Sequence, residues 1–141
     1  MLNKEQIMEI IPHRTPFLLI DEVLEMEPGK RVVALKHVTE DEYYFKGHFP
    51  GNPVMPGVLQ VESLAQAGAV CALSLEKNKG KTAYFAGLNK AKFRKKVVPG
   101  MTLRLEVEII RSLSKIGIGS AVAYDGDGDV VCSCEITFAI E

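Results

Sequence analysis

Two residue types suited to moving protons, a carboxylate and an imidazole, mark the most unusual segment of this chain. Glu62 is the only charged residue between Phe49 and Leu75, and His48 stands immediately before that stretch. Burial raises the pKa of a carboxyl group, so Glu62 is expected to hold its proton and to serve as a general acid. A neutral histidine is the complementary base. These residues predict acid–base chemistry in an apolar cleft.

The segment between the two residues is rich in glycine and proline, from His48 through Phe49, Pro50 and Gly51 to Pro56 and Gly57. Rigid irregular backbone is common where sites are assembled. His48 and Glu62 are fourteen positions apart, too far for one helix face. They meet only if the loop folds back or if each comes from a different subunit.

Gly57 stands where a helix is expected to begin, so its free amide could polarise a carbonyl oxygen. Each of the three residues also has a structural interpretation. Glu62 could be hydrogen-bonded for structure, His48 could be solvated, and Gly57 could simply start the helix.

The elements that must position these residues are strands around one central helix. Residues 58–77 are expected to form a helix that is almost wholly apolar around its full circumference, which requires other structure to wrap it. A short helix is expected after the N-cap Asn3. The expected strands cover residues 17–20, 31–38, 82–88, 90–93, 103–112, 116–124 and 130–140. This order predicts an α+β fold with one domain over residues 1–141, and its strand edges favour a homodimer.

Composition excludes several classes of function. The net charge of −1 argues against nucleic acid as the partner, because phosphate binding needs a positive excess. The polar residues of the central helix argue against a membrane span. No secretory signal is expected, and three cysteines without metal-ligand spacing indicate reduced thiols in the cytoplasm.

No metal site is predicted. The run Asp125-Gly126-Asp127-Gly128-Asp129 lacks the closing glutamate of a calcium loop, since Ile136 holds that position, and a hairpin turn is expected instead. His13 and His37 have no ligand partner at metal spacing and are expected to be structural.

One basic cluster interrupts an otherwise near-neutral chain: Lys90, Lys92, Arg94, Lys95 and Lys96. Alternate members of a strand share a face, so Lys90, Lys92 and Arg94 are expected to form a row. The cluster is either a solvated edge strand protected by its charges or a dock for an acidic partner. The sequence supports both interpretations.

Three motifs together resemble the β-hydroxyacyl-acyl carrier protein dehydratases of the FabZ type. They are the run from His48 to Gly57 with Gln60-Val61-Glu62, the run from Pro12 to Asp21, and Lys92-Phe93-Arg94 followed by Val98-Pro99-Gly100. The resemblance implies a hot-dog fold, in which a curved antiparallel sheet wraps one long helix, paired into dimers and usually a trimer of dimers. It also implies elimination of water from a (3R)-3-hydroxyacyl thioester on acyl carrier protein, giving the trans-2-enoyl thioester of fatty-acid elongation.

The resemblance further implies roles for single residues. His48 matches the catalytic histidine, and Glu62 matches the catalytic carboxylate contributed by the facing subunit. Gly57 matches the glycine whose amide contacts the thioester carbonyl. Phe49 and Tyr84 are assigned to substrate binding, with Tyr84 as an aromatic gate on the acyl tunnel.

Docking of the carrier protein is assigned to Lys92, Arg94, Lys95 and Lys96, and no cofactor is required. The sister dehydratase/isomerase family has Asp where this chain has Glu62, which favours plain dehydration. Two alternatives stay open. One is a hot-dog thioesterase, which would use its carboxylate to activate water. The other is a module that binds an acyl thioester without turning it over.

Overall fold

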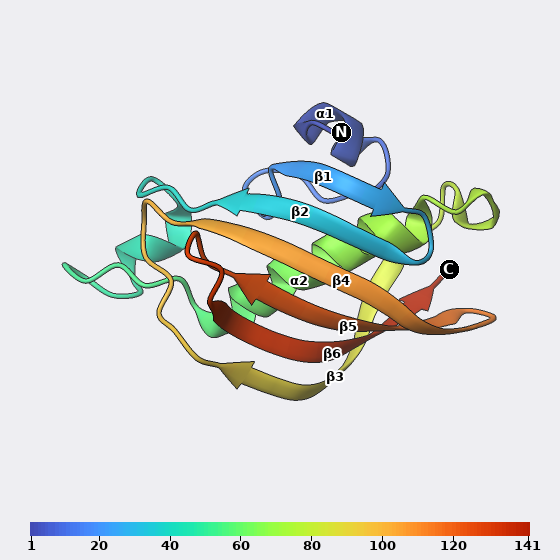
Figure 1. Ribbon diagram of the computed structural model, residues 1–141. Coiled ribbons are helices and arrows are strands. Elements are labelled where there is room, and N and C mark those ends of the chain that lie inside the picture. The colour runs from blue at the N-terminus through green and yellow to red at the C-terminus, as the bar shows by residue number, and fades with distance from the viewer.

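One long helix lies across a curved antiparallel sheet (Figure 1). The structure is a computed structural model, and it describes all residues from 1 to 141. The helical elements are α1 (Lys4–Met8), η1 (Tyr43–Lys46), α2 (Gly57–Leu73) and η2 (Glu76–Asn78). The strands are β1 (Glu22–Glu27), β2 (Arg31–His37), β3 (Ala83–Phe93), β4 (Thr102–Leu113), β5 (Ile116–Tyr124) and β6 (Val130–Ile140). The α+β prediction is confirmed.

The six strands pair in the order β1-β2-β4-β5-β6-β3, and every pairing is antiparallel. Buried and less buried residues alternate along β5 and β6, so one face of the sheet packs against α2. Strands β1 and β3 form the two edges of the sheet, and Leu2 pairs with Val23 at the β1 edge. No helix is long and apolar enough to cross a membrane.

Helix α2 is buried along most of its length because its side chains are small and apolar. Gly68 shows how closely the sheet approaches it: a methyl group there would lie 2.6 Å from the Phe138 ring. The helix ends at Leu73 rather than at the predicted Lys77. The Asn78 side chain donates to the carbonyl of Ala72 at 2.9 Å and adds a hydrogen bond at the C-terminal end of the helix.

One predicted strand was wrong, and one strand was not predicted. Residues 17–20 form no strand, although Leu18, Leu19 and Ile20 are buried as expected. The Leu19 amide donates to a side chain of α2, Oε1 of Gln66, at 2.8 Å, so it takes no place in a ladder. Strand β1, which the sequence did not predict, provides that edge of the sheet instead.

The remaining predictions fit with small shifts. The two strands expected at 82–88 and 90–93 are one strand, β3, with a bulge between Asn89 and Lys92. The capping box of α1 is confirmed, since the side chains and backbones of Asn3 and Gln6 bond reciprocally. The predicted turn is also confirmed, because the Asp125 amide donates to the Asp129 carbonyl at 2.9 Å.

Candidate active site

Glu62 lies in the second turn of α2, with 17% of its side chain exposed. Its Oε2 atom accepts a hydrogen bond of 3.0 Å from Nε2 of Gln66, one turn further along the helix. Burial raises the pKa of Glu62, and the Gln66 bond opposes this rise as the smaller effect. The predicted desolvation of this carboxyl group is therefore present within one chain.

A second titratable group faces the same carboxyl group. Nε2 of His13 lies 3.8 Å from Oε2 of Glu62. Burial, and then the charge of Arg14, lower the pKa of His13, which keeps its imidazole neutral. The sequence indicated only a structural role for His13, because no spacing rule relates it to a residue in α2 far along the chain. Its place within the run from Pro12 to Asp21, which resembles the family, was the one available signal.

His48 is held by the backbone around it. Its Nδ1 atom lies 2.7 Å from the carbonyl oxygen of Val54, and the amide of Val54 donates to the carbonyl of His48 at 2.9 Å. A carbonyl only accepts, so Nδ1 carries the hydrogen and the neutral ring has its lone pair on Nε2. The ring stacks on Phe49, with centroids 3.9 Å apart. The rigid segment thus presents a base with a defined tautomer.

Gly57 is the first residue of α2, so its N–H has no acceptor within the helix. A methyl group at this position would lie 2.9 Å from the ring of Phe93, at the end of β3. Phe93 itself is 52% exposed. The glycine therefore leaves room both for this aromatic ring and for a ligand oxygen approaching the amide.

Within a single chain, His48 and Glu62 form no hydrogen bond or ion pair with each other. The hydrogen bonds of His48 are to Tyr44 and Val54, whereas the carboxylate of Glu62 contacts Gln66 and His13. The two groups predicted to cooperate are therefore held by different neighbours: the backbone around His48 orients the imidazole, and side chains orient the Glu62 carboxyl group.

Comparisons with known proteins agree on one family. The FabA-like domain family matches residues 11–135. The chain belongs to the FabA-like family. A Clostridium novyi (strain NT) protein called 3-hydroxyacyl-[acyl-carrier-protein] dehydratase FabZ is 59% identical over 139 residues, covering 99% of this chain and 97% of the relative. A protein of the same name from Bacillus thuringiensis (strain Al Hakam) is 57% identical over 140 residues, covering 99% and 96%. The FabZ-type resemblance, and with it dehydratase activity, is confirmed.

Solved structures agree on the fold of this FabZ-type chain. The dehydratase heterocomplex ApeI:P from Xenorhabdus doucetiae superimposes with a TM-score of 0.81 at 16% identity, over 96% of this chain and 90% of that one. A hypothetical thioesterase with coenzyme A from Streptococcus pneumoniae TIGR4 gives 0.67 at 14% identity, over 85% and 84%. The hot-dog prediction is confirmed.

The residues assigned to substrate and carrier binding in the FabZ-type chain lie at its surface. Phe49 and Tyr84 are about half exposed. Lys90, Lys92 and Arg94 line one hollow of about 290 Å³ on the sheet, as the predicted row requires. Lys95 differs from them, since its Nζ lies 2.8 Å from carboxylates of both Asp125 and Asp129.

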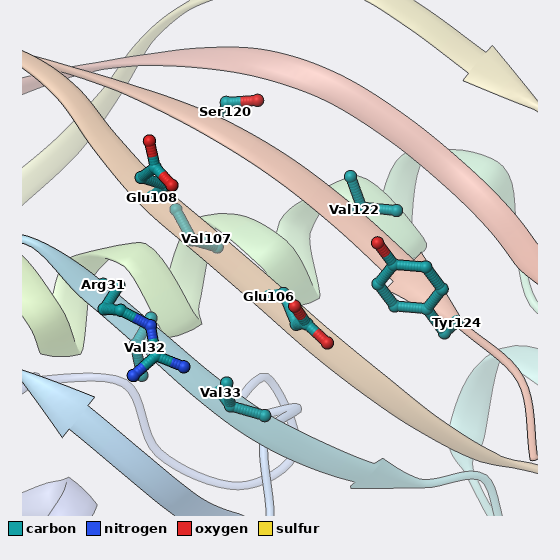
Figure 2. Close-up of a pocket in the computed structure, with 9 residues that line it drawn as sticks. All are labelled: Arg31, Val32, Val33, Glu106, Val107, Glu108, Ser120, Val122 and Tyr124. Atoms are coloured by element: carbon teal, nitrogen blue, oxygen red, sulfur yellow. The ribbon is translucent and has the colours of Figure 1, made fainter. Parts of the chain in front are cut away.

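Another hollow, of about 180 Å³, lies on the outer face of the sheet and is lined by neither His48 nor Glu62 (Figure 2). Strand β2 supplies Arg31, and β4 supplies Glu106 and Glu108. Helix α2, which carries Glu62, lies behind the sheet in this view. The chemistry of the FabZ-type chain is therefore not placed in this hollow.

Proposed function

We propose that this FabZ-type dehydratase uses His48 of one copy and Glu62 of a second copy to remove water from a (3R)-3-hydroxyacyl thioester. The acyl chain is carried on acyl carrier protein, and the product is the trans-2-enoyl thioester. One observation carries the proposal: His48 presents a free Nε2 and Glu62 is a desolvated acid, yet the two form no hydrogen bond or ion pair within one chain.

The reaction follows from these protonation states. Nε2 of His48 takes a proton from C2, while the Gly57 amide stabilises the negative charge that develops on the thioester oxygen. The C2–H electron pair forms the C2–C3 double bond, and the C3–O bond breaks. Glu62 gives its proton to the departing hydroxyl, which leaves as water. His48 then returns its proton to solvent, and Glu62 takes one up.

The free edge of β3 supports a homodimer. This strand is eleven residues long, and only two of its residues are even partly buried. Its exposed side chains include the large apolar residues Tyr84, Phe85, Leu88 and Phe93. An exposed apolar edge of this length is a template for pairing with another strand. We propose that β3 pairs with its own copy, and the FabZ-type resemblance favours a trimer of such dimers.

The ends of the acyl substrate have separate sites in this proposal. Phe49 and Tyr84 line the acyl tunnel, and Lys92, Arg94 and Lys96 receive the acidic carrier protein. Lys95 joins them only if its ion pairs with Asp125 and Asp129 break, which makes it the weakest of the four assignments.

Free, buried cysteines support a cytoplasmic location. We assign the reaction to one domain over residues 1–141.

Mixing two inactive variants tests the shared site. In a dimer of His48→Ala with Glu62→Gln, one site lacks both groups and the other retains both. Each variant alone is expected to be inactive, and random mixing should recover about a quarter of the activity, because half of the dimers carry one intact site. Enoyl absorbance reports dehydration, and free thiol reports hydrolysis by a thioesterase. A mixture that stays inactive despite subunit exchange contradicts the shared site.

A further inference from the structure

The two carboxylate oxygens of Glu62 have different surroundings. Both neighbouring polar groups, Nε2 of Gln66 at 3.0 Å and Nε2 of His13 at 3.8 Å, approach Oε2. The same chain provides no hydrogen bond to Oε1. Because a buried carboxyl group carries its proton on one oxygen at a time, this asymmetry bears directly on the acid step.

The amide of Gln66 has a fixed orientation. Its side chain is buried, and its Oε1 accepts the Leu19 N–H at 2.8 Å. Its Nε2 donates one hydrogen to the carbonyl of Phe17 at 2.9 Å and the other to Glu62. A flipped amide would place two acceptors together at Phe17 and two donors together at Leu19. Gln66 can therefore only donate to Glu62.

We propose that Gln66 is a positioning residue, which holds Oε2 of Glu62 as an acceptor so that the transferable proton is carried on Oε1. A proton on Oε2 would compete with the N–H of Gln66 for the space beside that oxygen and would make Oε2 a weaker acceptor for the Gln66 hydrogen bond. The proton on Oε1 has no such conflict and is free to reach the C3 hydroxyl. This inference rests on the proposed function, because it assigns the geometry of the same acid.

The neighbouring charges are consistent with this assignment. His13 faces Oε2 from the segment after α1, with Arg14 beside it, and His48 of the second copy joins them in the proposed dimer. Burial lowers the pKa of His13, so this imidazole is neutral and adds no charge that would pull the proton from Glu62. Gln66 supports the carboxylate that remains after proton transfer, since it goes on donating to Oε2.

Variants of Gln66 test the role. Gln66→Met removes the donor, whereas Gln66→Glu keeps an acceptor for Leu19 but replaces the donor to Glu62 with an acceptor. In both, kcat should fall about tenfold or more while KM changes less than about threefold, because the acid is misoriented. In Gln66→Met, the loss of kcat at high pH should move to higher pH, because the carboxylate loses its hydrogen bond.

Asn78→Leu is the matched control, since it removes another buried side chain that bonds to the backbone, at the far end of α2. A purely structural role for Gln66 predicts that its variants resemble this control, with an unmoved pH profile, and that result overturns the inference. Glu62→Gln separates the two proposals. If it stays active, the proposed acid itself is wrong; if it is inactive while the Gln66 variants match the control, only the positioning role of Gln66 fails.

A measurement on the unaltered protein covers the case in which the Gln66 variants do not fold. The two side-chain amide proton resonances of Gln66 should shift as Glu62 titrates, and the shift should disappear in Glu62→Gln. If the chemical shifts of the Gln66 amide protons stay constant while Glu62 titrates, the contact on which the inference depends is contradicted.

Discussion

Nδ1 of His48 lies 2.7 Å from the carbonyl oxygen of Val54, within a segment where the Val54 amide bonds back to the His48 carbonyl. This reciprocal pair sets the tautomer of the ring before any substrate arrives. Only Nε2 is left to act as a base, and the ring cannot turn without losing a hydrogen bond. Main-chain hydrogen bonds and the stacked ring of Phe49 therefore hold the proposed base in place.

Replacing His48 with alanine should lower kcat about a hundredfold or more, because the base that removes the C2 proton is lost. Enoyl absorbance with a 3-hydroxyacyl thioester measures the effect. His37→Ala is the control, since His37 is an exposed histidine at the end of β2 that pairs with Glu22. Its turnover should stay within about twofold of the unaltered protein. Equal rates for the two variants would remove His48 from its role.

Replacing Glu62 with glutamine should raise the free energy of unfolding at neutral pH. Burial raises the pKa of Glu62 above its usual value of 4.5, so this group favours the folded state below pH 4.5 and loses that contribution as pH rises through its folded pKa. Glutamine does not titrate. Denaturant unfolding should therefore show a gain that is absent at acidic pH and grows as pH rises. A gain that is independent of pH would contradict desolvation of the Glu62 carboxylate as its cause.

Replacing Gly57 with alanine tests whether the position needs a glycine because of the Phe93 ring or because a ligand oxygen must approach the amide. The added methyl group meets the Phe93 ring and also blocks the approach of a ligand oxygen to the amide. We expect kcat to fall about tenfold or more, with a stability cost of about 1 kcal/mol. In the double variant with Phe93→Leu, stability should recover while kcat stays low. Full recovery of kcat would mean that Phe93 alone requires the glycine.

Replacing Lys36 with methionine should destabilise the protein by about 3 kcal/mol, because it leaves Glu42 without its charged partner. Lys36 and Glu42 form an ion pair whose side chains are 5% and 15% exposed. Glu42 is also the N-cap of η1, which leads directly to His48. Replacing both residues with apolar ones should cost less than the single change. Denaturant unfolding of both single variants and the double variant measures this coupling, and additive losses would argue against it.

The residues proposed to react could be picked out from the sequence because their signals are local. Glu62 stands alone in an apolar run, His48 precedes a segment of glycine and proline, and Gly57 follows a proline at a helix start. The central helix and strands β5 and β6 were predictable for the same reason. Periodicity over neighbouring residues reflects which face of an element is buried.

The residues that surround and orient Glu62 were decided by the tertiary structure. Gln66 binds backbone atoms of Phe17 and Leu19, which lie 49 and 47 positions away. Residues 17–20 carried the apolar pattern of a strand, yet a buried side chain from α2 takes the Leu19 amide and competes with sheet pairing. His13 reaches Glu62 through the same packing. Pairings of this kind depend on three-dimensional proximity, which local pattern does not encode.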